Sequence, residues 1–327
     1  MATSGADNAM WRIRTYDTPD VVARLPRRPG AAAGLLRETS VLQQLGKTQL
    51  RSVVRTPQVH HVGGPHERFP HHWSVVEWIE GTDAWTARRD LDRRPLDDLA
   101  ADLAQAVVVI GRTAIEGAPD RLPGSRGGPL GPLLERLDQW LTAPEWNAAH
   151  LIDVEAVRRL VSEAIEIVDE PIVEGFVHGD LIPGNLLVDR GRLTSIIDWG
   201  GAGRGDLAQD LAPAWAVLTA AERPVFREAV DADEAAWIRG RTFELEHAVG
   251  GVLYYAPKKH PLGDVMARTL HRILTATRPT CRILDPPRIP VGGGAAAPWA
   301  STTLRAGARS GAGRCSPMCR SRTLERC

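Results

Sequence analysis

Residues 176–188 read FVHGDLIPGNLLV, and residues 195–199 read SIIDW. The pattern predicts an apolar strand, a tight polar loop, a second apolar strand, a turn, and a third apolar strand. Asp180, Asn185 and Asp198 would stand at or beside strand ends, and all three offer oxygen ligands that suit a hard cation such as Mg²⁺. A loop Asp, an Asn a few residues later and a separate Asp are also the arrangement used for kinase-type phosphoryl transfer.

In this interpretation Asp180 orients an attacking hydroxyl and accepts its proton, while Asn185 and Asp198 hold Mg²⁺ against nucleotide phosphates. Each of these residues alone could merely cap a turn, and it is their combination that favours the functional interpretation. We expect His178 to be a buried structural hydrogen-bonding residue. We expect Asp206 to cap the next helix and thereby to anchor the loop.

The chain totals leave several protein classes out. A length of 327 residues is sufficient for two lobes, and Lys+Arg equals Asp+Glu at 40 each, so charge favours neither nucleic acid nor an anionic membrane as a partner. The start of the chain lacks a signal pattern, and no apolar run approaches the ~20 residues of a membrane span. All four cysteines lie beyond residue 280, which excludes a disulfide or zinc framework for the main body. We therefore expect a cytoplasmic monomer or homodimer.

Apolar periodicity divides the chain at about Gly81. Before this residue we predict strands and one helix, at 5–14, 21–25, 31–45 (the helix), 58–62 and 73–81. After it we predict helices at 97–113, 133–141, 154–168, 208–218, 220–229, 235–255 and 262–277, with a Gly- and Pro-rich loop at 117–132. The prediction is an α+β protein with a small β-rich lobe (1–81), a larger mostly helical lobe (82–278), and a disordered tail (279–327).

The small lobe contains candidates for nucleotide binding. Arg24 would project from a strand and Glu38 from the following helix, and a cation paired to a helix carboxylate positions nucleotide phosphates in kinase folds. Lys is the common choice, but Arg can hold phosphate bidentately; the alternative is a surface ion pair worth ~0–1 kcal/mol. Asp7 and Asn8 could lie at the tip of a phosphate-covering loop, and Trp78 near the interlobe hinge could stack on a ligand.

Three motifs together resemble those of the aminoglycoside phosphotransferase family, whose members are antibiotic and small-molecule kinases. The motifs are HGDLIPGN at 178–185, IDW at 197–199 and GD at 205–206. The likeness covers residues 5–277 and includes small-lobe segments in the family's order: GADN at 5–8, VARLPRR at 22–28, Glu38, FPHHWSV at 69–75 and EG at 80–81. Within the family, the chain looks most like the subgroup with Arg on the nucleotide strand.

The resemblance implies a bilobal protein-kinase-like fold. It also implies transfer of the γ-phosphoryl group of ATP or GTP to a hydroxyl of a small molecule such as an aminoglycoside, a macrolide or a metabolite. By position, Asp180 resembles the catalytic base, Asn185 and Asp198 the magnesium ligands, and Arg24 with Glu38 the phosphate-positioning pair.

Residues 77–81 resemble the hinge that receives adenine through backbone groups. The chain departs from the family in three places. So few residues precede Gly5 that we expect the nucleotide-covering loop to lack its first strand. Leu207 stands where Pro is usual, and the tail after Pro279 has no counterpart. The alternatives are therefore a catalytically silent kinase-like protein and, as a third possibility, a metal-dependent phosphohydrolase.

The acceptor is the least determined part of the prediction. A cationic aminoglycoside would require an acidic pocket in the helical lobe, for which the candidates are Glu244, Glu246 and Asp264. A macrolide or another large apolar substrate would suit aromatic residues, and the candidates are Trp215, Trp237, Tyr254 and Tyr255. Acidic helix residues are also routine at solvated positions, and the aromatic residues are equally plausible as core.

Overall fold

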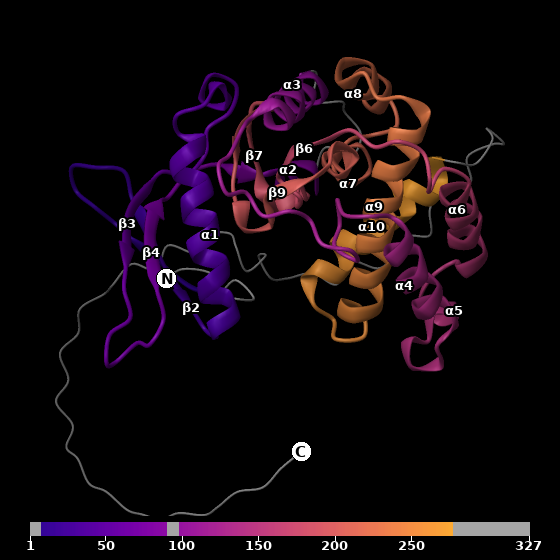
Figure 1. Ribbon diagram of the computed structural model, residues 1–327, viewed down its shortest axis with the longest axis horizontal. Coiled ribbons are helices and arrows are strands. Elements are labelled where there is room, and N and C mark those ends of the chain that lie inside the picture. The colour runs from indigo at the N-terminus through magenta and orange to yellow at the C-terminus, as the bar shows by residue number, and fades with distance from the viewer. Residues whose placement is uncertain (1–7, 90–97, 277–327) are drawn as a thin grey trace, which may run out of the picture.

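The computed structural model describes residues 8–89 and 98–276, which form a small β-rich lobe and a larger helical lobe (Figure 1). The small lobe is an antiparallel sheet of strand order β1-β2-β4-β3, with helix α1 packed against it. Its elements are β1 (Asn8–Ile13), β2 (Val21–Pro26), α1 (Pro29–Leu45), β3 (Val59–Gly63) and β4 (Trp73–Glu77). The predicted α+β bilobal class is therefore confirmed.

Strand β2 lies inside the sheet and sets the position of Arg24. Val22 pairs with Val76 of β4, and both side chains are buried. Arg24 pairs with Ser74 two residues further along, so it shares the face of Val22 because side chains alternate along a strand. Helix α1 buries an apolar stripe that includes Leu35 against this part of the lobe.

Two small sheets at the lobe junction hold the polar loop of residues 178–185. Strand β5 (Thr82–Asp83) pairs with β7 (Leu186–Asp189), which pairs in turn with β8 (Arg192–Ile196). Strand β6 (Glu174–Val177) pairs with β9 (Gly203–Asp206). Because β6 enters the loop and β7 leaves it, hydrogen bonds of both sheets fix the two ends of the loop.

The helical lobe is built around α9. Both faces of α9 are largely buried, and it packs against α4, α6 and α10 (Figure 1). The helices are α2 (Ala84–Arg89), α3 (Leu99–Arg112), α4 (Gly131–Thr142), α5 (Ala148–Leu151), α6 (Val154–Glu166), α7 (Pro213–Ala216), α8 (Arg223–Val230), α9 (Glu234–Tyr255) and α10 (Pro261–Ala276). Among the described residues, no helix is long and apolar enough to cross a membrane.

Two predicted elements are wrong. The helix expected at 208–218 is a 3-10 segment, η5 (Leu207–Leu211), followed by the short α7. Pro213 lacks the N–H that would continue the helical hydrogen bonds from one segment into the next. The strand expected at 73–81 ends at Glu77, where the chain crosses between the lobes. The predicted tail at 279–327 lies outside the described residues.

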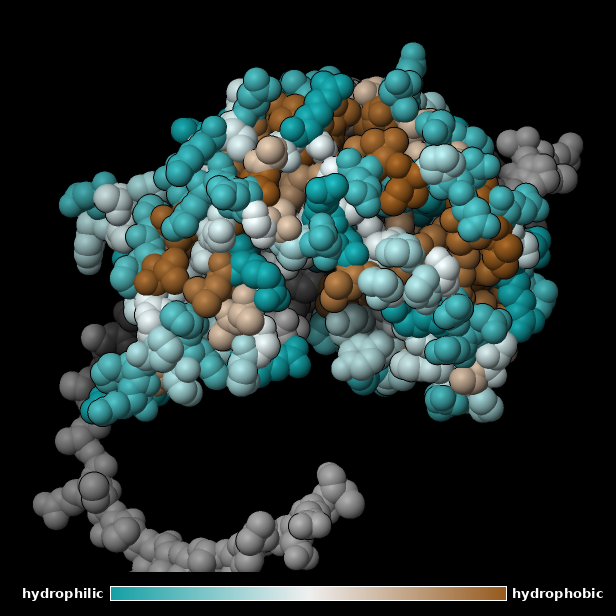
Figure 2. Space-filling view, viewed as in Figure 1, coloured by the Kyte–Doolittle hydropathy of each residue, from teal (hydrophilic) through white to brown (hydrophobic). Residues whose placement is uncertain are grey.

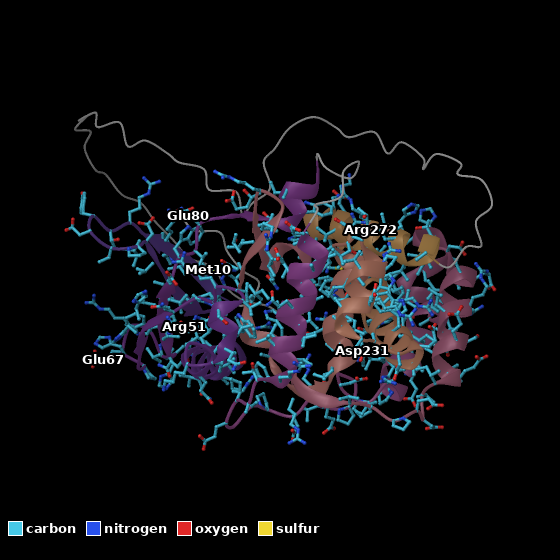
Figure 3. All side chains as sticks on the ribbon, turned by 90° about the horizontal axis from the view of Figure 1, so that it is seen from above. Met10, Arg51, Glu67, Glu80, Asp231 and Arg272 are labelled. Carbon is cyan, nitrogen blue, oxygen red and sulfur yellow. The ribbon has the colours of Figure 1, made fainter. Side chains whose placement is uncertain are left out.

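The two lobes meet along a notch in the surface (Figure 2). Seen from above, Met10 belongs to the small lobe and Asp231 and Arg272 to the helical lobe (Figure 3). Two cavities lie at the lobe junction, and Met10 lines both of them. Asp231 lines a different cavity, next to α8. The two cavities at the junction are also lined by residues that the sequence singled out, namely Arg24, Glu38, Asp180, Asn185 and Asp198.

Candidate active site

The 178–185 loop takes its shape from Gly179. This residue has a φ of 78°, in the left-handed region that glycine tolerates best. A Cβ at this position would lie 2.6 Å from the carbonyl oxygen of Gly201, so the loop also approaches a second backbone segment closely. The loop ends in the turn η3 (Pro183–Asn185), which places Asn185 directly before β7.

Asp180 stands at the bend of this loop, and its side chain is 27% exposed. Asn185 Nδ2 donates to the backbone oxygen of Asp180 at 2.9 Å and to its Oδ2 at 3.1 Å. Arg126 Nη2 lies 3.4 Å from Oδ1. Burial raises the pKa of Asp180, but the positive charge and the hydrogen bond of Arg126 oppose this, and the pKa lies below its ordinary value. Asp180 is therefore a carboxylate at neutral pH.

Asp210 holds the backbone of the 178–185 loop in place, a role that the sequence did not predict for it. Asp210 is 2% exposed, and its two oxygens accept from the backbone N–H groups of His178 (2.7 Å) and Gly179 (2.9 Å). His178 is fully buried, and its Nδ1 accepts from the N–H of Asp180 at 3.2 Å. Its Nε2 then donates to the carbonyl of Ile197 at 3.1 Å. Burial lowers the pKa of His178, so the ring is neutral, and its predicted structural role is confirmed.

Asp206 caps η5 as predicted, since its Oδ1 accepts from the N–H of Ala208 at 3.0 Å. Its other oxygen accepts from Arg239 Nε at 2.8 Å, and both side chains of this pair are only 4% exposed. Asp206 therefore holds η5 to α9. The direct hydrogen bonds to the 178–185 loop come instead from Asp210.

Asp198 follows β8 and adopts a left-handed backbone with a φ of 62°. The preceding N–H of Ile197 donates to the carbonyl of Asn185 at 3.0 Å, which fixes Asp198 and Asn185 side by side. A Cβ on Gly200 would lie 3.5 Å from Asp198 Oδ1 and 3.6 Å from Glu38 Oε2. Two carboxylates thus approach the same point, which is an arrangement that cations stabilise.

Arg24 of β2 and Glu38 of α1 form an ion pair, with Nη1 and Oε1 2.5 Å apart. Glu38 is 3% exposed and also accepts a backbone hydrogen bond from Trp199, which ties α1 to the segment after Asp198. Burial would lower the pKa of Arg24, but Glu38 and Asp198 raise it above its ordinary value. The pair is therefore a mostly buried link between β2 and α1 of the small lobe and not a surface ion pair.

Two adjoining cavities hold these residues. The first, of about 220 Å³, has apolar walls that include Val22 and Val76, and it is bordered by Arg24, Asn185 and Asp198. The second, of about 570 Å³, is more polar and is lined by Asn8, Arg24, Glu38, Asp180 and Asp198 among others. The two cavities share Arg24 and Asp198, and we call them together the interlobe cleft.

Trp78 lines the first cavity, as predicted for a residue near the hinge. Its ring is covered on one side by Arg12, whose guanidinium carbon lies 4.6 Å from the ring centre. Its backbone N–H donates to the carbonyl of Asp20 at 2.8 Å, so this N–H is already used within the protein. Asn8 begins β1 and lines the second cavity, where its Oδ1 has no hydrogen-bond partner among the described residues. Asp7 lies outside the described residues.

A third cavity, of about 500 Å³, lies in the helical lobe beside Asp180, and we call it the acceptor groove. Arg126 joins it to Asp180, because its Nη2 faces Asp180 while its Nη1 donates to His247 Nδ1 at 2.9 Å. The lining is Arg121, Gly124, Ser125, Arg126, Arg136, Trp140, Trp146, Glu246, His247, Gly250, Gly251, Tyr254 and Tyr255.

The groove accounts for some of the acceptor candidates and excludes others. Tyr254, Tyr255 and Glu246 line it, as the two substrate hypotheses required. Trp215 is fully buried, and its ring centre lies 4.6 Å from that of Trp237. Trp237 is partly buried against the core, so both residues belong to the core. Two acidic candidates do not line it either, since Glu244 is 1% exposed beneath His247 and Asp264 lies on the exposed side of α10.

No group of three or more His, Cys, Asp or Glu side chains within residues 8–89 and 98–276 could hold a metal ion. The two magnesium ligands that the sequence predicts are one carboxylate, Asp198, and one amide, Asn185, and both border the first cavity. Asn185 donates its Nδ2 to Asp180, which leaves its Oδ1 for the cleft. This donor set is too small for a structural metal cage but suits Mg²⁺, which takes few protein ligands and completes its shell with water and phosphate.

The fold and the cleft define a kinase-like phosphotransferase, and comparisons with known proteins agree. The sequence profile described as "Phosphotransferase enzyme family" (APH) matches residues 2–245. The chain therefore belongs to the phosphotransferase enzyme family, whose enzymes transfer phosphate to a hydroxyl group. No curated protein matches the chain in sequence.

Similar solved structures share the fold at low sequence identity. Macrolide 2'-phosphotransferase MphH from Brachybacterium faecium is 20% identical, with a TM-score of 0.56 over 85% of this chain and 91% of that one. The GDP complex of aminoglycoside 2'-phosphotransferase-IIIa is 18% identical, with a TM-score of 0.60 over 84% and 91%. A thermostable mutant of aminoglycoside phosphotransferase APH(4)-Ia, in a ternary complex with AMP-PNP and hygromycin B, is 16% identical, with a TM-score of 0.55 over 85% and 93%.

Proposed function

We propose that this enzyme transfers the γ-phosphoryl group of ATP or GTP to a hydroxyl of a small molecule bound in the acceptor groove. One observation carries the proposal. Arg24, Asn185 and Asp198 border the same cavity as Trp78, and Asp180 meets Arg24 and Asp198 in the adjoining cavity. A phosphate-binding cation, two oxygen ligands and a carboxylate base thereby face one cleft, as phosphoryl transfer requires.

Asp180 is the proposed base. Its lowered pKa keeps it ionised at neutral pH, and its position between the interlobe cleft and Arg126 of the acceptor groove puts it between donor and acceptor. It would accept a hydrogen bond from the attacking hydroxyl, orient that oxygen toward the γ-phosphorus, and take its proton. A positioned base of this kind contributes about 10²- to 10⁴-fold to the rate.

Asn185 and Asp198 are the proposed ligands for Mg²⁺. Bound there, Mg²⁺ would neutralise the charge of the nucleotide phosphates and hold them for in-line attack. The chain's own part is to keep the two ligands together, which it does through the hydrogen bond between Ile197 and Asn185 and through the Asn185 amide bonds to Asp180.

The nucleotide base would occupy the first cavity, between apolar side chains such as Val22 and Val76, with the hinge at residues 77–81 alongside. Arg24 would reach the phosphates from the opposite end, where its guanidinium can form two parallel hydrogen bonds. The similar structures bound to GDP and AMP-PNP support a purine nucleotide as the donor.

A thermal-shift titration tests the proposal. Mg²⁺ with ATP or GTP should raise the melting temperature, since ligand at 100 times its Kd adds about 2.7 kcal/mol to the free energy of unfolding. Arg24→Gln should remove most of that gain. No stabilisation of the wild type at millimolar nucleotide would favour a catalytically silent kinase-like protein, and cleavage of phosphate esters without nucleotide would favour a phosphohydrolase.

A further inference from the structure

The charge of the acceptor groove points to a class of acceptor. Three arginines line the groove, and Glu246 is the one acidic side chain in its described lining. Arg136 already neutralises Glu246, with Nη2 2.7 Å and Nε 2.9 Å from Oε1. The lining as a whole is therefore basic.

The remaining two arginines are held in place by different partners. Arg121 donates to the backbone carbonyls of Gly201 (2.5 Å) and Arg126 (2.7 Å), and the carboxylates of Asp210 and Asp180 act on its charge. Arg126 faces Asp180 at 3.4 Å, which is long for a charged pair. Its Nη2 can therefore pair with an acidic group on a bound molecule, while its Nη1 keeps the 2.9 Å hydrogen bond to His247 Nδ1.

The other walls of the groove are flat and apolar. Trp140 and Trp146 meet edge to face with their ring centres 6.1 Å apart. A Cβ on Gly250 of α9 would lie 2.7 Å from the Trp140 ring. Because glycine has no Cβ, the indole packs directly against the helix backbone. Tyr254 is 51% exposed and continues this aromatic surface. The guanidinium carbon of Arg136 lies 5.5 Å from the ring centre of Trp140, and the aromatic surface that stays accessible offers edge and face contacts to a planar ring.

Beyond the aromatic residues the groove continues. Trp146 and Tyr254 also line the next cavity, of about 590 Å³, which is bordered by Glu145, His150 and Lys258. The ammonium of Lys258 lies 3.0 Å from the ring centre of Tyr254. The groove and its extension are therefore long enough for an acceptor larger than a single sugar.

We propose that the acceptor is a hydroxyl compound that combines a planar apolar ring with an acidic group, and that polycations are rejected. The acidic group would pair with Arg126 and would share Arg136 with Glu246, and the ring would contact Trp140 and Tyr254. The inference rests on the proposed function, because it names the acceptor class of the same reaction. An acidic groove would have indicated the opposite choice.

The test measures binding of three probes by isothermal titration calorimetry, with the full chain saturated by Mg²⁺ and a non-hydrolysable ATP or GTP analogue. Phenyl β-D-glucuronide and phenyl β-D-glucoside present the same ring and differ in one carboxylate, while kanamycin is a polycation. We expect the glucuronide to bind about tenfold more tightly than the glucoside, as one charge-assisted pair would give, and kanamycin to bind more weakly than either.

Two matched variants within one ion pair fix the sign of the effect. Arg136→Gln should reduce the preference for the glucuronide over the glucoside, and Arg126 accounts for the part that remains. Glu246→Gln should strengthen glucuronide binding, because it frees Arg136. The inference is overturned if kanamycin binds more tightly than the glucuronide, if Glu246→Gln weakens binding of the glucuronide, or if neither glycoside binds at millimolar concentration. Stabilisation by the nucleotide is measured in parallel and depends on neither variant, so its absence would be a failure of the proposed function and not of the acceptor class.

Discussion

Replacing Asp210 by Asn tests how the 178–185 loop is held. The two Asp210 oxygens accept from the N–H groups of His178 and Gly179 at 2.7 and 2.9 Å in a fully buried site. An amide can accept at only one of its two terminal atoms, so one N–H loses its partner and meets an NH₂ group. Hydrogen bonds to a charged group are worth about 1.5–3 kcal/mol, and the orphaned N–H adds its desolvation penalty, so we expect a loss of about 2–4 kcal/mol.

The same change should slow the reaction. His178 and Gly179 lead directly into Asp180, so a shift of this backbone moves the proposed base, and misplacement by about 1 Å costs about 10²-fold in rate. Urea denaturation gives the free energy of unfolding, and Mg²⁺-dependent turnover of ATP or GTP gives the rate.

Asp206→Asn is the matched control, four positions earlier in the chain. It breaks the buried pair with Arg239 and should cost about 3–5 kcal/mol, yet it makes no hydrogen bond to the loop in the structure. Its turnover should stay within about threefold of the wild type wherever the variant is folded. Equal turnover losses in the two variants, or unchanged turnover in Asp210→Asn, would refute the anchoring argument.

Three further outcomes are expected. Gly179→Ala should lower the free energy of unfolding by about 2–4 kcal/mol, because its Cβ would lie 2.6 Å from a backbone oxygen at a φ of 78°. A Cβ on Gly184 meets nothing within 4 Å, so Gly184→Ala should lower it by at most about 1 kcal/mol. Urea denaturation of the two variants makes the comparison. Burial lowers the pKa of His178 below 6.5, so the unfolded chain binds a proton that the folded protein does not. The free energy of unfolding should therefore fall as the pH drops below about 6.5, by at most about 1.4 kcal/mol per pH unit. Denaturation at several pH values should show a less steep fall in His178→Gln. Arg24→Gln leaves Glu38 without its buried partner and should lower stability by about 3 kcal/mol beside removing the nucleotide-induced thermal shift, whereas an unchanged melting temperature would mean that the pair is dispensable.

The sequence was informative where the chemistry is local. Asp180 and Asn185 lie five positions apart on one loop, and Asp198 ends the next apolar strand, so periodicity and turn residues alone place them together. Arg24 and Glu38 required only the order strand, then helix, and the structure brings them into an ion pair.

Partners from distant segments were beyond reach. Arg121 and Arg126 lie in a Gly- and Pro-rich stretch that predicts only a loop, and Asp210 bonds across 32 and 31 positions to the backbone of His178 and Gly179. Strand β9 (Gly203–Asp206) shows no alternation of apolar and polar residues, so the sequence gives no strand signal there. It is a strand because its backbone pairs with β6. The split of the predicted helix at Pro213 did have a signal, since proline inside a helical pattern ends it.

The most direct test of the central claim compares wild type with Asp180→Asn in Mg²⁺-dependent turnover and in nucleotide-induced thermal shift. The account assigns Asp180 to the attacking oxygen and not to nucleotide binding. It predicts that Asp180→Asn keeps the thermal shift of the wild type and loses at least about 10²-fold in turnover. Full turnover in Asp180→Asn would contradict the account.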